Sequence, residues 1–202
     1  MRRRLFAVFV GLVSALTLVG PVLADTTPGP GPGHFRDSGS NTYLFAFGTV
    51  CGQSTCTDTN VSANTTVLQG GDTFLSVCVD QFTYPIKGGN RFKSLSGCSE
   101  DAGPNVAADL SSGSAEATFL ADSCGRRSCS TVNVTVSLTL AAVAAPVAYS
   151  YSQKSTFQNC TDTQRVKGQA SDAEGSIVIN GASMDAFGQI GAESFSFSSR
   201  CR

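Results

Sequence analysis

The eight cysteines of this chain, all of them after residue 50, place the strongest constraint on how it can fold. Four of them form two close pairs with four residues between the sulfurs, Cys51 with Cys56 and Cys124 with Cys129. The other four are Cys78, Cys98, Cys160 and Cys201. An even number of cysteines is typical of a disulfide-bonded protein when the chain is exported.

The first 24 residues have the composition of an export signal. Arg2, Arg3 and Arg4 precede an apolar stretch that runs from residue 5 to residue 20, and small residues lead up to Ala24. This order is typical of a cleavable signal peptide, and the apolar stretch is shorter than the roughly 20 residues that span a bilayer as a helix. We therefore expect residues 1–24 to be removed, and the mature chain to be secreted without a membrane span.

The charge balance argues against nucleic acid as a partner. The whole chain has 14 Lys and Arg against 15 Asp and Glu, and three of the arginines lie in the leader. Binding to phosphates needs clustered basic side chains, and the only dense basic cluster in the linear sequence is the one in the leader. We therefore expect no nucleic-acid binding by the mature chain.

Residues 25–41 read as a linker or a disordered arm, because Pro and Gly alternate there and almost nothing apolar is available to bury. The only histidine, His34, lies in this segment, where a solvated side chain is the simplest interpretation. Residues 42–202 then form one domain of ordinary size.

Strand periodicity dominates this domain. Between Val132 and Leu140, apolar residues alternate with Asn, Ser and Thr without a break, which predicts a strand with one buried and one wet face. Further strands are predicted at 43–50, 73–84, 91–95, 116–123, 147–156, 165–170, 176–180 and 193–200. With no helical stripe after the leader, the sequence predicts an all-β fold, an antiparallel two-sheet β-sandwich stapled by disulfides, in preference to a barrel.

The disulfide pairing follows from the predicted hairpins, although eight cysteines allow 105 connectivities. Each close pair sits where a turn joins two strands, so we expect Cys51–Cys56 and Cys124–Cys129 to clip hairpins. Cys78 and Cys98 flank a turn at 85–90, and Cys160 and Cys201 remain. Zinc is the rival reading, but the four-residue spacing is at the edge of the zinc pattern and an oxidising compartment favours disulfides. No metal or cofactor is expected.

A faint internal repeat has an offset of 73 residues. Cys51, Gly52, Cys56, Asn60 and Val61 recur as Cys124, Gly125, Cys129, Asn133 and Val134. Either a β-unit around 43–62 and 116–135 has been duplicated, or the same hairpin is used twice independently.

The sequence offers few candidate arrangements of catalytic residues. With His34 in the linker and all cysteines expected in disulfides, no Ser/His/Asp or Cys/His arrangement is available in the domain. The acidic residues Glu100, Asp101, Asp172 and Glu174 lie in predicted loops, where they fit a solvated surface better than a glycosidase pair or a calcium loop.

Two further patterns are weak. Tyr149 and Tyr151 share one strand face and offer a small aromatic platform in a chain without tryptophan, although sheet packing is the simpler use. Arg126 and Arg127 lie in a clipped turn, which suggests a protease-inhibitor-like loop or merely solvated arginines.

The sequence therefore favours a secreted, non-enzymatic β-sandwich protein that binds an unknown extracellular ligand or a cell-envelope component, or serves a structural role. The alternatives are a secreted carboxylate-dependent polysaccharide hydrolase and the inhibitor-like loop at Arg126 and Arg127.

Overall fold

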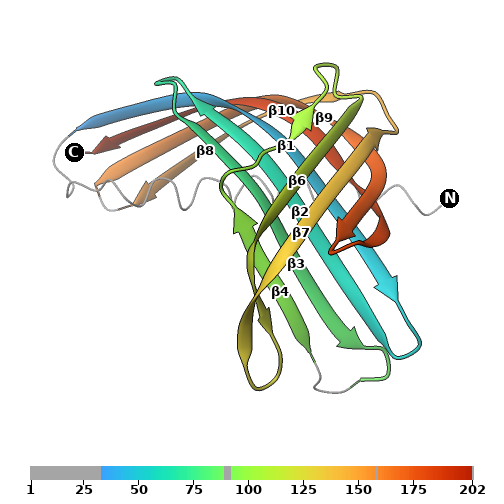
Figure 1. The fold of residues 1–202 in the computed structure, drawn as a ribbon. Helices are drawn as coiled ribbons and strands as arrows, with labels where there is room; N and C mark the ends of the chain where they lie inside the picture. Colours follow the sequence, from blue (N-terminus) through green and yellow to red (C-terminus); the bar gives the residue numbers. More distant parts are fainter. Residues whose placement is uncertain (1–32, 89–91, 158, 202) are drawn as a thin grey trace.

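The computed structural model describes residues 33–88, 92–157 and 159–201. Within these residues the structure contains antiparallel strands and no helix (Figure 1), which confirms the all-β class. The strands are β1 (His34–Cys51), β2 (Thr55–Leu68), β3 (Thr73–Pro85), β4 (Lys93–Ser99), β5 (Asn105–Val106), β6 (Ser112–Cys124), β7 (Cys129–Ala142), β8 (Val147–Phe157), β9 (Cys160–Ile179) and β10 (Ala182–Cys201). The expected signal peptide, residues 1–24, lies outside the described part of the chain.

Hydrogen bonds join all of these strands into one sheet, in the order β10-β1-β2-β3-β4-β6-β7-β9-β8, with the short β5 beside β6. Because β10 also pairs with β9, the strands from β1 through β4, β6, β7, β9 and β10 form a closed ring. The expected division into two separate sheets is therefore not seen in the hydrogen-bond pattern. Alternation of apolar and polar residues shows which face of a strand is buried, but it does not say which strands pair, so the sequence did not separate these architectures.

Strand β9 changes partner halfway along its length, and this creates an extension of the closed sheet. Residues 160–170 of β9 pair with β8, whereas residues 173–179 pair with β7. We call the extension the flange: it consists of β8, residues 160–170 of β9, residues 191–201 of β10 and residues 34–43 of β1. Figure 1 shows these four strands projecting together beyond the rest of the sheet.

The core fills the closed part of the sheet. The alternating apolar residues of β7, from Val134 to Leu140, are almost fully buried, as their periodicity predicts. They pack with small and medium-sized side chains from the other ring strands, including Leu44 and Ile190. Strands approach closely where a side chain is absent: a Cβ at Gly188 would meet the Phe45 carbonyl oxygen and lie 2.8 Å from the Cα of Ala46. Glycine at such positions lets the sheet bend tightly enough to close.

Most strand predictions overlap observed strands, with two informative exceptions. The segments 165–170 and 176–180 belong to one continuous strand, β9. Strand β2 and the first half of β10 were not predicted at all. Both are rich in small and polar residues, and their buried positions include Thr59, Ala63 and Ala186 rather than a run of large apolar side chains.

The structure joins the cysteines in the four expected pairs, Cys51–Cys56, Cys78–Cys98, Cys124–Cys129 and Cys160–Cys201. In each pair the two residues are direct cross-strand partners, with Cα atoms 3.9–4.1 Å apart. Each bond therefore locks the register of one hairpin.

The two hairpins of the weak repeat have matching geometry. The turns close with a hydrogen bond from Gly52 N to Thr55 O at 2.8 Å and from Gly125 N to Ser128 O at 2.9 Å. Beside each disulfide, at positions offset by 73, a Thr hydroxyl donates to an Asp carboxylate: Thr49 to Asp58 at 2.8 Å and Thr131 to Asp122 at 3.4 Å. At this offset Thr49 corresponds to Asp122, and Asp58 corresponds to Thr131. Thr and Asp have therefore changed strands between the two hairpins, while the hydrogen-bonded Thr–Asp pair is kept.

The segment expected to be a linker is a strand from His34 onward, because β1 runs without interruption from His34 to Cys51. Residues 34–38 pair with β10 and thereby belong to the flange. Phe35 is their only apolar residue, so no alternating pattern marked a buried face. Residues 25–32 of the expected linker lie outside the described residues.

Candidate functional site

The two faces of the flange have different chemistry. Cross-strand partners project to the same side of a sheet, so the strand registers assign every flange residue to one face. One face, the basic face, is built from alternate residues of the four strands. From β8 to β1 it carries Ala148, Ser150, Ser152, Lys154 and Thr156; Thr161, Thr163, Arg165, Lys167 and Gln169; Ala192, Ser194, Ser196, Ser198 and Arg200; and His34, Arg36, Ser38, Ser40 and Thr42.

The charges of the basic face have one sign. Its five permanent cations are Arg36, Lys154, Arg165, Lys167 and Arg200, and every one of them is exposed. No carboxylate, Phe, Tyr or large aliphatic side chain is among its members, whereas Ser and Thr are the commonest. The cations therefore have no acidic neighbour on their own face to neutralise them.

The opposite face, here called the aromatic face, holds the acidic and aromatic residues of the same strands. Its members include Asp37, Asp162, Glu193, Phe35, Tyr43, Tyr149, Tyr151, Phe157, Phe195 and Phe197. The Phe35 and Phe197 rings pack with centroids 6.2 Å apart, and Val166 is only 2% exposed on this side. Phe35, Tyr151 and Phe157 of the same face remain exposed.

A hydrogen-bonded cluster lies on the aromatic face of the flange, at the end that adjoins the closed part. The Tyr149 hydroxyl donates to Glu193 Oε2 at 2.7 Å, and Asn41 Nδ2 donates to Glu193 Oε1 at 3.4 Å. The Tyr43 and Tyr149 hydroxyl oxygens are 3.4 Å apart. Burial raises the pKa of Tyr149 far above its ordinary value, helped by its hydrogen bonds to Tyr43 and Glu193, and burial likewise raises the pKa of Tyr43. The two tyrosine hydroxyls thus keep their protons at neutral pH.

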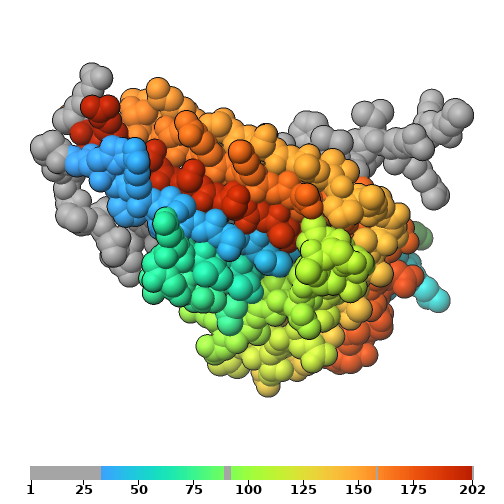
Figure 2. Space-filling model, turned by 90° about the horizontal axis from the view of Figure 1, so that it is seen from above, coloured from blue at the N-terminus to red at the C-terminus, as the bar shows by residue number. Residues whose placement is uncertain are grey.

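A shallow depression of about 680 Å³ lies where the flange meets the closed part. Lys167, Ser150, Ser194 and Gln169 of the basic face border it, and Leu110 forms a wall. Atoms of Tyr149 and Glu193, whose side chains belong to the opposite face in the register, also line it. Leu110 is 4% exposed and is held by a tight turn with positive φ, in which its N–H donates to Ala107 O at 2.9 Å. Figure 2 looks onto this side of the flange, where the segment around residue 110 lies beside the middle of β10.

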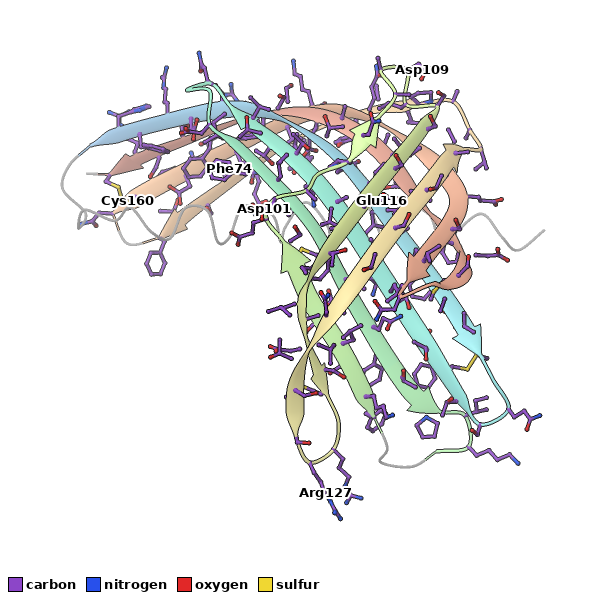
Figure 3. The ribbon with its side chains drawn as sticks, viewed as in Figure 1. Phe74, Asp101, Asp109, Glu116, Arg127 and Cys160 are labelled. Carbon is purple, nitrogen blue, oxygen red and sulfur yellow. A yellow bond between two sulfur atoms is a disulfide. The ribbon has the colours of Figure 1, made fainter. Side chains whose placement is uncertain are left out.

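The carboxylates singled out in the sequence are not brought together. Glu100 and Asp101 lie in an exposed bend after β4. Asp172 and Glu174 lie in strand β9 and not in a loop, on the outer side of the closed sheet, where Gln189 Nε2 donates to Asp172 Oδ1 at 3.2 Å. Neither pair borders the depression. Figure 3 shows the labelled acids Asp101, Asp109 and Glu116 on separate elements.

The other predicted residues also lie apart. Arg126 and Arg127 are exposed in the β6–β7 turn, and Figure 3 shows Arg127 at the tip of that hairpin, far from Cys160 at the free end of the flange. Tyr149 and Tyr151 do share one face of β8, but Tyr149 is occupied by Glu193 and Tyr43 and offers no free platform. His34 is exposed at the start of β1, on the basic face.

The basic face itself was missed from the sequence. Its cations come from segments spread between residues 36 and 200, and no two of them are adjacent. The signal was present within single strands: between residues 161 and 169, Thr, Arg, Lys and Gln occupy one parity, while Asp162 and Val166 occupy the other. Only the register of β8, β9, β10 and β1 shows that the cations share one surface.

Among the residues that the structure describes, no helix is long and apolar enough to cross a membrane. The same part of the chain contains no group of three or more His, Cys, Asp or Glu side chains arranged to hold a metal ion. Comparisons with protein-family models, with curated proteins and with solved structures found no match for this chain.

Proposed function

We propose that this chain is an extracellular, non-enzymatic binding protein and that the basic face of the flange is its binding surface. The observation that carries the proposal is the separation of chemistry across the flange: exposed cations and hydroxyl side chains on one side, and aromatic residues and carboxylates on the other. A sheet that only needed to be soluble has no reason to collect its cations on one side and its carboxylates on the other.

The disulfides support the extracellular part of the proposal. All eight cysteines are consumed in cross-strand bonds, a usage that fits an oxidising compartment. Detection of the protein in the culture medium, with its N-terminus at residue 25, tests this part directly. Retention of the intact chain inside the cell would contradict it.

The binding part is tested by sedimentation with insoluble cell-envelope material. We expect the wild-type protein to sediment with the envelope, and the triple variant K154Q/R165Q/K167Q to stay in solution. Binding that survives the triple substitution would show that another surface carries the function.

The non-enzymatic part is tested with polysaccharide, ester and protein substrates, for which we expect no turnover. The carboxylates on which the polysaccharide-hydrolase alternative was based, at Glu100, Asp101, Asp172 and Glu174, lie away from the depression. If a polysaccharide were cleaved and E174Q abolished the cleavage with the fold intact, the binding-protein proposal would have to be replaced.

A further inference from the structure

We infer that the ligand of the basic face is a linear acidic polysaccharide, a chain of sugars that bear carboxylate or sulfate groups. This inference rests on the proposed function and goes further by naming the class of ligand. Four features of the basic face support it: the single sign of its charge, the spacing of its cations, its many hydroxyl groups and the depression beside Lys167.

The cations are spread along the flange and do not form a single pocket. Lys167 and Arg165 are two residues apart on β9, which places their Cα atoms about 7 Å from each other. Arg200 lies across from Thr161 of β9, which is six residues from Lys167. The cross-strand row of residues that contains Lys167 is therefore about 20 Å from the row that contains Arg200. A compact anion would touch one or two of these cations, whereas an extended polyanion can contact cations in several successive rows.

Arginine strengthens the argument for carboxylate or sulfate. Three of the five cations are Arg36, Arg165 and Arg200, and a guanidinium binds a planar or tetrahedral oxyanion with two parallel hydrogen bonds. No carboxylate lies on the basic face, so these guanidinium groups have no ion pair on that face to break before they bind a ligand.

The uncharged members of the face suit sugars better than bases. Hydroxyls of Ser150, Ser152, Ser194 and Ser196 surround Lys167 and Arg165 in the register, and Gln169 adds an amide. Such groups exchange hydrogen bonds with the hydroxyls of a polysaccharide. Single-stranded nucleic acid instead needs aromatic side chains on which bases stack, and the Phe and Tyr residues of the flange lie on the other face.

The depression gives the chain of sugars a defined place beside Lys167. Ala148, Ala192, Ser150 and Ser194 border it, and their small side chains leave the floor of the sheet open. The segment that contains Ala108 and Leu110 closes it on one side. A sugar ring lying here places a carboxylate or sulfate within reach of Lys167, while its neighbours continue along the row of cations.

The experiment measures the affinity of the secreted protein for two defined polymers, polygalacturonate and heparin, with neutral dextran as the uncharged reference. We expect saturable binding to the acidic polymers that weakens as salt is raised, and no binding to dextran. The variant K154Q/R165Q/K167Q is expected to lose about tenfold or more in affinity, because it removes three exposed charge contacts.

The matched control is K93Q/R126Q/R127Q, which changes the net charge equally but lies in β4 and in the β6–β7 turn. We expect it to bind like the wild type. All six positions are exposed, and an unchanged unfolding midpoint verifies that each variant folds. R36Q/R200Q tests the same face from β1 and β10, and it is expected to weaken binding as well.

Several results would overturn the inference. Equal losses in the two triple variants would show that net charge, and not the basic face, governs binding. Single-stranded DNA that bound as tightly as the polysaccharides at the same salt would show a surface for any polyanion. Failure to bind either acidic polymer would exclude this ligand class. If envelope sedimentation by the basic face were still observed, the proposed function would stand and only the ligand class would be wrong.

Discussion

Removal of the disulfide at the end of the flange is expected to cost much more stability than removal of a hairpin clip. Cys160 and Cys201 are 41 residues apart in sequence, and Cys51 and Cys56 are 5 apart. In the chain-entropy model, a bond that closes the longer loop restricts the unfolded chain more, which gives about 4 kcal/mol for C160S/C201S and about 2 kcal/mol for C51S/C56S.

The folded structure explains why the unfolded state should dominate the comparison. Strands β9 and β10 pair without interruption from Ile179 and Ala182 to Cys160 and Cys201, so the folded hairpin keeps its ladder when the sulfur bond is lost. The turn between Cys51 and Cys56 is likewise held by the hydrogen bond from Gly52 to Thr55. In both variants the folded geometry has other support, and the loss appears mainly as extra freedom of the unfolded chain.

The assay is guanidinium unfolding of both double variants and the wild type, followed by two probes. The larger shift of midpoint should belong to C160S/C201S, with an m-value that does not fall. Equal losses, or a larger loss for C51S/C56S, would refute the reasoning and show that local packing around the turn dominates. A lower m-value for C160S/C201S would also contradict it, because the flange would then open separately from the closed part.

Three further predictions concern the core, the closing of the sheet and the tyrosine cluster. L138A should lower the free energy of unfolding by about 2–5 kcal/mol in denaturant titrations, whereas L120A, at a side chain that is 68% exposed, should change it by less than about 0.5 kcal/mol. G188A should cost about 2 kcal/mol in the same assay, because its Cβ would overlap the backbone of β1. Y149F should cost about 1 kcal/mol at neutral pH through its lost hydrogen bond to Glu193. Since the folded state raises the pKa of Tyr149 above its usual value of 10.0, the wild type should lose stability as the pH rises past about 10, and midpoints measured against pH should fall less steeply in Y149F.

The sequence determined the local features of this protein because they depend on short-range rules. Strict alternation from Val132 to Leu140 predicted a half-buried strand, and the structure buries its apolar set. Cysteines that flank turns predicted their own partners, because residues on either side of a hairpin turn are cross-strand neighbours. The all-β class followed from the same period of two along the chain.

The closed sheet and the basic face were decided only by the tertiary structure. Strand β9 pairs with β8 along one half and with β7 along the other, and its own residues carry no mark of where this change occurs. Strand β2 escaped prediction because the interior of a tightly closed sheet selects small residues, and small residues give a weak periodic signal. The cations are far apart in sequence, and only the long-range register of four strands puts Arg36, Lys154 and Arg165 on one surface. Alternation fixes a residue's face within its own strand, but a surface made by several strands depends on pairing between distant segments, which no local pattern specifies.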